Sequence, residues 1–182
     1  YLLLAKDSQT GSRKIRIGET NLGDLAADAY RDQLGADIGL CNAGAIHSNI
    51  SAGNITCNDV LNIFPFGNTG CVSEATGQQI KDALEMASRS YPNENGGFLQ
   101  VSGLTYVINT SISSSVQLDQ KENFIAVKGA YRVNDIMING QPLDLTKSYT
   151  VASNDYLLKQ GGDGMTMFKG CTVAKDNMML DA

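Results

Sequence analysis

The sequence has a single histidine, His47, among its 182 residues. Zinc proteases and dinuclear metal hydrolases usually take several of their metal ligands from histidine. We therefore do not expect a metal site of that kind to be built from this chain alone. The sequence also lacks any run approaching the ~20 apolar residues that a membrane-spanning helix requires, so no membrane segment is predicted.

The four cysteines, Cys41, Cys57, Cys71 and Cys171, include no C-x-x-C pair. This absence argues against a zinc knuckle and against a thioredoxin-type redox site. Four cysteines allow three complete disulfide pairings, and the sequence does not choose among them. The simplest interpretation is four ordinary, mostly buried thiols.

Positive charge is outnumbered: 14 Lys and Arg stand against 19 Asp and Glu, which gives a net charge of −5. A surface that binds nucleic acid or an anionic membrane needs a basic face, so neither partner is predicted. The overall composition is that of an ordinary globular protein.

The length of the chain corresponds to one domain. We expect this domain to span residues 1–182, with residues 1–12 as a leading segment and residues 170–182 as a tail. The chain starts at Tyr1 with neither a methionine nor a signal peptide. It therefore resembles a processed protein or a piece of a longer one.

Hydrophobic periodicity predicts helices over residues 20–34 and 76–89, and the second begins with the capping-box pattern Thr76-Gly77-Gln78-Gln79. Shorter helices are expected between Thr56 and Pro65 and near Asn154. Strands are expected at 38–41, 72–75, 103–109, 123–127, 131–138 and 148–153, with a hairpin turn at Asn139-Gly140. Helices and strands alternate early and strands dominate later, so the predicted fold class is α+β.

The segment Gly161-Gly162-Asp163-Gly164 is a glycine-rich loop that does not match a phosphate-binding P-loop. Its glycines would let the backbone approach a ligand closely and would present the Asp163 carboxylate. Such a carboxylate is a good acceptor for a pair of sugar hydroxyls. The alternative is a plain β-turn without a ligand.

The loop Phe64-Pro65-Phe66-Gly67-Asn68 contains two aromatic residues. An exposed aromatic ring in a loop can serve as a stacking platform for a nucleobase. The alternative is that a phenylalanine here caps the core. We expect one of the two rings to be buried and the other to be presented.

Three further side chains are candidates for contact with an anion. Arg13 and Arg16 could hold it with their planar guanidinium groups, or they could form a solvated basic patch. His47 could face an anion or be an ordinary loop histidine. Pairing of His47 with Ser48 as a catalytic base and nucleophile is not favoured, because adjacent residues rarely face each other usefully.

Taken together, a set of motifs covering residues 13–168 resembles the carboxy-terminal domain of the 5′-nucleotidase family, which includes ecto-5′-nucleotidases and periplasmic UDP-sugar hydrolases. The motifs occur in the family order. They are RIGETNLGDL (16–25), NAGAIH (42–47), IT (55–56) with DVL (59–61), PFGN (65–68), GFLQVSG (97–103), YTVASNDY (149–156) and GGDG (161–164).

The resemblance implies an α+β fold with helices flanking stacked mixed β-sheets. It implies that this domain binds the substrate and holds no cofactor. A separate amino-terminal metallophosphoesterase domain, absent from this sequence, would carry two divalent metal ions and perform the hydrolysis. The resemblance further implies a secreted, periplasmic or surface-anchored protein.

The resemblance also implies roles for individual residues. The nucleobase would stack between the aromatic rings of Phe66 and Tyr156, and the ribose hydroxyls would bind Asp163. Asn42 and Asn68 match family asparagines near the base.

Arg16, with Arg13 as a second candidate, matches arginines that contact the nucleoside and phosphate region. The chain departs from the family pattern at the motif Asn-x-Gly-x-Ile-Arg, which ends here in His47. The stretch from Tyr156 to Asp163 is also one residue longer than the commoner spacing, which affects the choice of the second aromatic partner.

The expected function is nucleotide or nucleoside recognition within a secreted 5′-nucleotidase-type phosphohydrolase. Its partners would be the ligand and the amino-terminal domain of the same parent chain. The alternative is a non-catalytic interaction module that keeps the fold and has lost nucleotide affinity. The replacement of the family arginine by His47 is the feature that favours this alternative.

Overall fold

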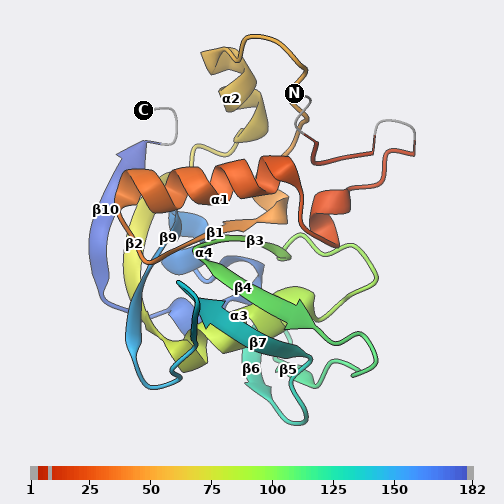
Figure 1. The fold of residues 1–182 in the computed structure, drawn as a ribbon, viewed down its shortest axis with the longest axis vertical. Coiled ribbons are helices and arrows are strands. Elements are labelled where there is room, and N and C mark those ends of the chain that lie inside the picture. Colours follow the sequence, from red (N-terminus) through yellow and green to blue (C-terminus); the bar gives the residue numbers. More distant parts are fainter. Residues whose placement is uncertain (1–3, 8–9, 180–182) are drawn as a thin grey trace.

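The computed structural model describes residues 4–7 and 10–179, and Figure 1 shows its elements. The helices are α1 (Asn21–Leu34), α2 (Cys57–Ile63), α3 (Gly77–Ser88) and α4 (Asp155–Leu158). The strands are β1 (Ile38–Asn42), β2 (Thr69–Thr76), β3 (Leu99–Ser102), β4 (Leu104–Ile108), β5 (Val116–Leu118), β6 (Phe124–Val127), β7 (Val133–Ile138), β8 (Gln141–Pro142), β9 (Ser148–Asn154) and β10 (Val173–Met179).

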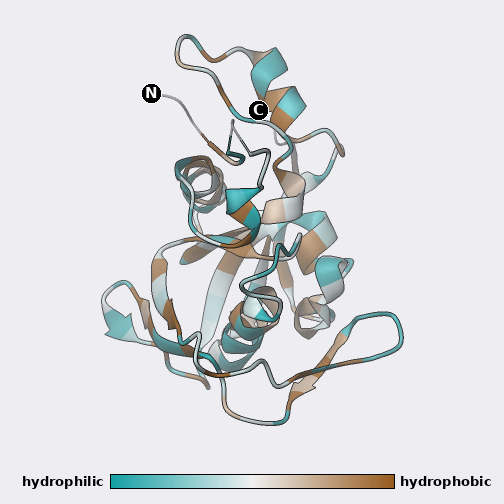
Figure 2. Cartoon of the chain, turned by 90° about the vertical axis from the view of Figure 1, so that its right-hand side faces the viewer, coloured by the Kyte–Doolittle hydropathy of each residue, from teal (hydrophilic) through white to brown (hydrophobic). Residues whose placement is uncertain are grey.

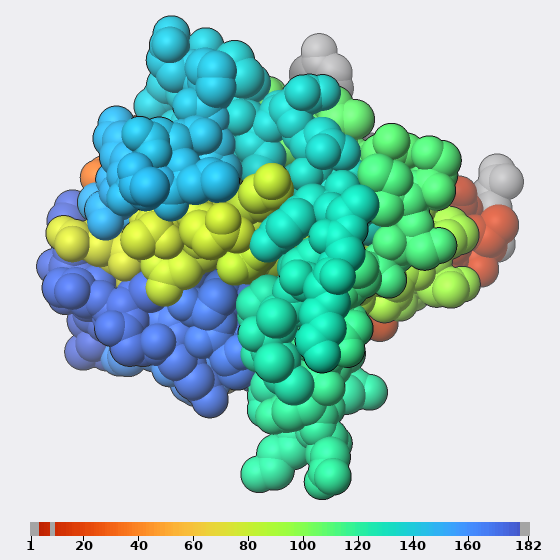
Figure 3. All heavy atoms as spheres, turned by 90° about the horizontal axis from the view of Figure 1, so that it is seen from below, coloured from red at the N-terminus to blue at the C-terminus, as the bar shows by residue number. Residues whose placement is uncertain are grey.

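The described strands form three sheets. The largest has the order β10-β2-β9-β1-β3, in which β1 and β9 run parallel and the other neighbours are antiparallel. Strands β4, β7 and β8 form a second sheet. Strands β5 and β6 form a two-stranded ribbon, which projects from the body of the molecule in Figure 3. The predicted class, α+β with helices flanking mixed sheets, is confirmed.

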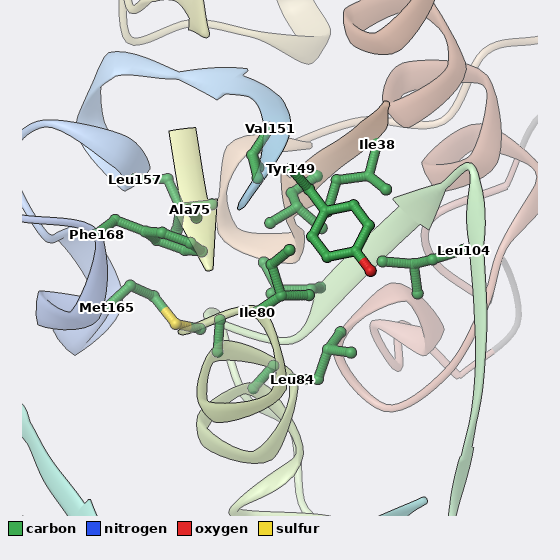
Figure 4. Packing of buried hydrophobic residues seen from close by; sticks show 14 of the residues in the cluster. Ile38, Ala75, Ile80, Leu84, Leu104, Tyr149, Val151, Leu157, Met165 and Phe168 are labelled. Atoms are coloured by element: carbon green, nitrogen blue, oxygen red, sulfur yellow. The ribbon is translucent and has the colours of Figure 1, made fainter. Parts of the chain in front are cut away.

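The five-stranded sheet separates two apolar cores, one on the side of α1 and one on the side of α3. Ile38 and Leu40 of β1 belong to the α3-side core, whereas Cys41 belongs to the α1-side core. This alternation follows from the two-residue period of a β-strand. Figure 4 shows Ile80 and Leu84 of α3 among the residues of the α3-side core.

The close contact between α1 and the sheet depends on a glycine in β1. A Cβ atom at Gly39 would lie 2.2 Å from the backbone oxygen of Ala27 in α1. Only a residue without a side chain therefore permits the helix to pack at this distance. Consequently, α1 packs directly against the backbone of β1.

The helix starts follow the capping signals of the sequence. The capping box between Thr76 and Gln79 is present at the start of α3, and a second one joins Thr56 and Asp59 at the start of α2. The side chain of Thr20 accepts a hydrogen bond at the start of α1. Each cap satisfies a backbone N–H that has no partner within its helix.

Strands β3, β5 and β10 were not predicted from the sequence. In β3 the polar Gln100 is buried, where its amide donates to the backbone oxygens of Ile15 and Gly18. This buried polar residue obscures the hydrophobic pattern. Strand β10 lies within residues 170–182, described above as a tail, and pairs with β2 through two register shifts. It has no hydrophobic alternation because it is an exposed edge strand.

Hydropathy is mixed along most elements. In Figure 2 both hydrophilic and hydrophobic residues occur along the helices, as expected where one face packs on a core. The helices in the described ranges all fall short of the length and apolar character that a membrane-spanning helix requires.

The cysteines are unpaired thiols. Cys41 and Cys71 are buried, Cys171 is half-buried and Cys57 is exposed. Burial raises the pKa of the Cys41 thiol to about 12, so this thiol stays protonated and unreactive at neutral pH.

Candidate functional site

One edge of the five-stranded sheet brings together segments that are distant in the sequence. Because β1 and β9 are parallel neighbours, Asn42 and Asn154 at their carboxyl ends lie side by side. Strand β2 runs antiparallel to β9 and pairs Gly70 with Asn154, so the loop before β2 meets the same edge. The carboxyl ends of strands at a change of topology are common places for ligand sites.

A chain of hydrogen bonds runs along this edge. The side chain of Asn154 makes two hydrogen bonds. Its Oδ1 accepts one from the backbone N–H of Leu157 at 2.8 Å, and its Nδ2 donates one to Oδ1 of Asn42 at 3.0 Å. Nδ2 of Asn42 in turn donates to Oδ2 of Asp163 at 2.7 Å. Both asparagines are buried, at 0% and 3% exposure. Because both asparagine amides in this series of hydrogen bonds have partners, the network fixes the direction of the Asp163 carboxylate.

The second oxygen of Asp163 lies 3.5 Å from the hydroxyl group of Tyr156, which also accepts a hydrogen bond from the Asp163 N–H at 3.1 Å. Asp163 has a φ of +52°, a conformation that aspartate tolerates better than most residues. A Cβ atom at Gly162 would lie 2.2 Å from the Tyr156 ring, and one at Gly97 would lie 2.9 Å from the Asp163 side chain. The glycines therefore make room for these two side chains.

The two phenylalanines of the loop between α2 and β2 behave differently. Phe64 is half-buried and its ring meets Tyr30 of α1 edge to face, with centroids 6.5 Å apart. Phe66 is 60% exposed. The ring of Phe66 is presented as expected, whereas Phe64, expected to be buried, is only half-buried against the core.

These segments enclose a cavity of about 300 Å³. Its lining residues are Asn42, Gly44, Ala45, Phe66, Asn68, Tyr156 and Asp163. The volume is at the lower end of the range of small-molecule sites. Five of the eight predicted site residues thus line one cavity. One aromatic ring comes from the loop before β2 and the other from α4, and the Asp163 carboxylate follows both in the sequence.

The other three predicted residues, Arg13, Arg16 and His47, are not part of the lining of this cavity. The His47 ring meets the Phe66 ring edge to face, with centroids 4.8 Å apart and an interplanar angle of 81°. The Arg13 guanidinium donates to the backbone oxygen of Ile46. Among the described residues, the buried Nε atoms of Arg13 and Arg16 have no hydrogen-bond partner.

Positive charge gathers at this side of the cavity. Partial burial lowers the pKa of His47, and the charges of Arg13, Lys6 and Arg16 lower it further, while a hydrogen bond to the backbone of Gly44 opposes the shift. Burial and the charge of Arg16 also lower the pKa of Arg13, whereas the charge of Glu94 opposes this shift. The imidazole is therefore mainly neutral at pH 7, and the arginines supply the positive charge.

The titration of His47 provides a first test. Its NMR Cε1–H resonance is expected to titrate with a midpoint below the ordinary value of about 6.5. Because the pKa is lower in the folded state, the unfolded state binds more protons as the pH falls through this window. Protonation should thus lower the free energy of unfolding below about pH 6.5.

Assignment is direct, since the chain contains one histidine. The His47→Gln variant should lose the resonance and with it this part of the pH dependence of stability. A midpoint above the ordinary value would contradict the electrostatics described here, because it would require a carboxylate facing the ring.

A larger hollow of about 370 Å³ lies between the start of α1 and strands β3 and β4. Glu19 and Asp24 are among its lining residues. Burial raises the pKa of Asp24, and the neighbouring Glu19 and Asp28 carboxylates raise it further. Such a lining repels a phosphate, so this hollow is a poorer candidate for a nucleotide than the cavity at the sheet edge.

Sequence reasoning missed several residues of the site. Asn154 was expected as a helix start and within the motif YTVASNDY, but not as a site residue, although its side chain connects Asn42 to α4. Gly44 and Ala45 line the cavity within a motif that was noted for its first and last residues. Arg89 is near enough to Asp163 for the carboxylate to raise its pKa, against the lowering effect of burial. Asn154 follows a predicted strand directly, and this position was the available signal.

The donor set does not fit a metal pair. The sequence has one histidine, and no group of three or more His, Cys, Asp or Glu residues within the described ranges is placed to hold a metal ion.

Comparison with known proteins identifies the family. The model of the 5′-nucleotidase C-terminal domain matches residues 4–170. The chain belongs to this family. The resemblance found in the sequence is thereby confirmed.

Two curated relatives show how much of a longer protein this domain represents. The trifunctional nucleotide phosphoesterase protein YfkN of Bacillus subtilis is 34% identical over 190 residues, covering 100% of this chain and 12% of the relative. Protein UshA of Escherichia coli is 30% identical over 151 residues, covering 83% of this chain and 24% of the relative. The chain thus spans a quarter or less of the length of these relatives.

Solved structures agree with the family. The 5′-nucleotidase precursor from Thermus thermophilus matches with a TM-score of 0.80 at 30% identity, covering 99% of this chain and 33% of that one. The NAD nucleotidase of Haemophilus influenzae matches with a TM-score of 0.65 at 25% identity, covering 88% of this chain and 27% of that one.

Proposed function

We propose that this chain binds the nucleoside part of a nucleotide, as the substrate-recognition domain of a 5′-nucleotidase-type phosphohydrolase. The observation that carries the proposal is the convergence of two aromatic rings, two asparagines and one oriented carboxylate on the cavity of about 300 Å³. Aromatic rings can stack on a flat nucleobase, and a carboxylate can accept hydrogen bonds from two neighbouring sugar hydroxyls.

The base would stack on Phe66, with Tyr156 as the second ring. Phe66 is exposed and therefore able to cover a base without first leaving the core. Tyr156 is held by its hydrogen bonds to Asp163. Asn68 lies in the same lining and offers amide groups to the edge of the base.

The ribose would bind Asp163. An ionised carboxylate accepts about four hydrogen bonds, and protein donors use one position on Oδ2 and a long contact on Oδ1. Lone pairs remain for two vicinal hydroxyls. In this interpretation Asn42 acts mainly by orienting the carboxylate.

The phosphate would lie toward Arg16, Arg13 and His47. The unpartnered Nε atoms of the two arginines support this assignment, because a buried guanidinium N–H without an acceptor is costly. His47 is mainly neutral at pH 7, so we assign the anionic contact to the arginines.

Hydrolysis is proposed to belong to a further part of the parent protein. The relatives are several times longer than this chain, and the single histidine does not suit a dinuclear metal site. An amino-terminal metallophosphoesterase domain with two divalent metal ions would be the partner. A secreted, periplasmic or cell-surface location is part of the same proposal, as is the assignment of residues 1–182 to one domain.

Calorimetric titration of the 182-residue chain with adenosine, uridine and ribose 5-phosphate tests the proposal. Binding of nucleosides with a contribution from the base is the expected result. The absence of nucleoside binding at millimolar concentration would favour the alternative, an interaction module that has lost nucleotide affinity.

The Phe66→Ala variant is expected to weaken adenosine binding by about tenfold, since one base–aromatic stack contributes ~1–3 kcal/mol. Stability should change little because the ring is 60% exposed. Ile125→Ala on β6 is the matched control, since this side chain is 59% exposed and lies outside the cavity lining. Equal affinities of Phe66→Ala and the unmodified chain would exclude stacking on Phe66.

A further inference from the structure

We infer that His47 is a positioning residue, which holds the Phe66 ring at the angle needed for base stacking. The inference rests on the proposed function of the cavity. It assigns His47 a role through Phe66, instead of the direct anion contact that the family arginine suggests.

The Phe66 loop has little support of its own. Among the described residues, no backbone–backbone hydrogen bond involves Phe66 or Gly67. A Cβ atom at Gly67 would meet nothing within 4 Å, so the loop is open on that side. Within the same residues, His47 provides the only ring contact of Phe66. A mobile ring would lose conformational entropy on stacking, and a neighbour that orders it beforehand reduces this loss.

His47 is well placed to order the ring because it is itself anchored. The backbone N–H of His47 donates a hydrogen bond to the backbone oxygen of Ile63, at the end of α2, at 3.0 Å. His47 lies in the same loop as Gly44 and Ala45, which line the cavity. The preceding residue, Ile46, accepts a hydrogen bond from Arg13. His47 therefore belongs to the loop that lines the cavity and at the same time contacts the Phe66 ring.

The charges around His47 favour this role over direct binding of an anion. The groups that act on its ring are Lys6, Arg13 and Arg16, all cationic. They favour the neutral imidazole, whose edge-to-face contact with Phe66 has the geometry preferred by aromatic pairs. An arginine at position 47 would add a fourth cation and remove the ring contact.

A double-mutant cycle tests the inference with adenosine and ribose 5-phosphate as ligands. The His47→Ala variant should weaken adenosine binding by about three- to tenfold, the range for an edge-to-face aromatic contact, and leave ribose 5-phosphate binding unchanged. The His47→Phe variant should restore adenosine affinity because it retains an aromatic edge. In the Phe66→Ala background, His47→Ala should have no further effect.

An equal loss of affinity for both ligands would overturn the inference, since it would make His47 an anion contact. So would an undiminished effect of His47→Ala in the Phe66→Ala background. If the unmodified chain binds no adenosine, the proposed function itself fails. The titration of the unmodified chain shows this separately from the comparison of the variants.

A ligand-free measurement keeps the inference testable in that case. With 4-fluorophenylalanine at the five phenylalanine positions, the ¹⁹F resonance of Phe66 is assigned by its loss in Phe66→Ala. It should shift in His47→Ala while the other resonances stay in place. An unmoved Phe66 resonance would contradict the positioning role, and movement of all resonances would indicate a general structural effect and contradict it as well.

Discussion

Replacing Asp163 with asparagine is expected to weaken adenosine binding by between about tenfold and one-hundredfold, because hydrogen bonds to a charged acceptor contribute ~1.5–3 kcal/mol each. Asparagine tolerates the φ of +52° at this position, so the loop should keep its conformation. The new amide group, however, would place a donor where Asn42 or a ribose hydroxyl needs an acceptor.

The ligand series supplies the control for this variant. The unmodified chain should bind adenosine more tightly than 2′-deoxyadenosine, and Asp163→Asn should bind the two equally. Calorimetry measures both affinities, and thermal unfolding verifies that the variant is folded. A variant that still prefers adenosine by the original factor would show that the ribose binds elsewhere.

Replacing Glu85 with alanine is expected to destabilise the fold strongly without acting on the site. Glu85 of α3 is fully buried, and its Oε2 accepts the backbone N–H groups of Arg132 and Val133 at 2.9 and 3.0 Å. Removing the carboxylate leaves two buried donors without an acceptor, which costs about 3 kcal/mol or more. For a chain of this size, the unfolding temperature should fall by about 10 °C.

Thermal unfolding followed by circular dichroism measures this effect. Glu85→Gln retains an oxygen at the same place and should lose less stability than Glu85→Ala. Glu74→Ala is the exposed control and should change the free energy of unfolding by less than about 0.5 kcal/mol. If Glu85→Ala were as stable as Glu74→Ala, the carboxylate would not be needed to satisfy the start of β7.

The sequence predicts the elements whose signals are local. Helix α3 was found because the Thr76–Gln79 capping box and the apolar spacing both lie within the helix itself. The hairpin between β7 and β8 was found from Asn139-Gly140. Strand β10 was missed because it is an exposed edge strand, and its pairing with β2 is decided by a partner about a hundred residues away.

The candidate site was predictable in part, because several of its residues belong to short motifs along the chain. The motifs supplied Phe66, Tyr156 and Asp163, and the structure places them in one cavity. The hydrogen bond between Asn42 and Asn154 depends on β1 and β9 being parallel neighbours, which no local pattern in the chain encodes. The contact between His47 and Phe66 likewise arises only in three dimensions.

A crystal structure of the 182-residue chain with adenosine is the most direct measurement of nucleoside recognition at the sheet edge. The base is expected between the Phe66 and Tyr156 rings, with the ribose hydroxyls within hydrogen-bond distance of the Asp163 carboxylate. A nucleoside bound elsewhere, such as in the hollow beside Glu19 and Asp24, would contradict the proposed site. So would a cavity at the sheet edge that remains free of adenosine at saturating concentration.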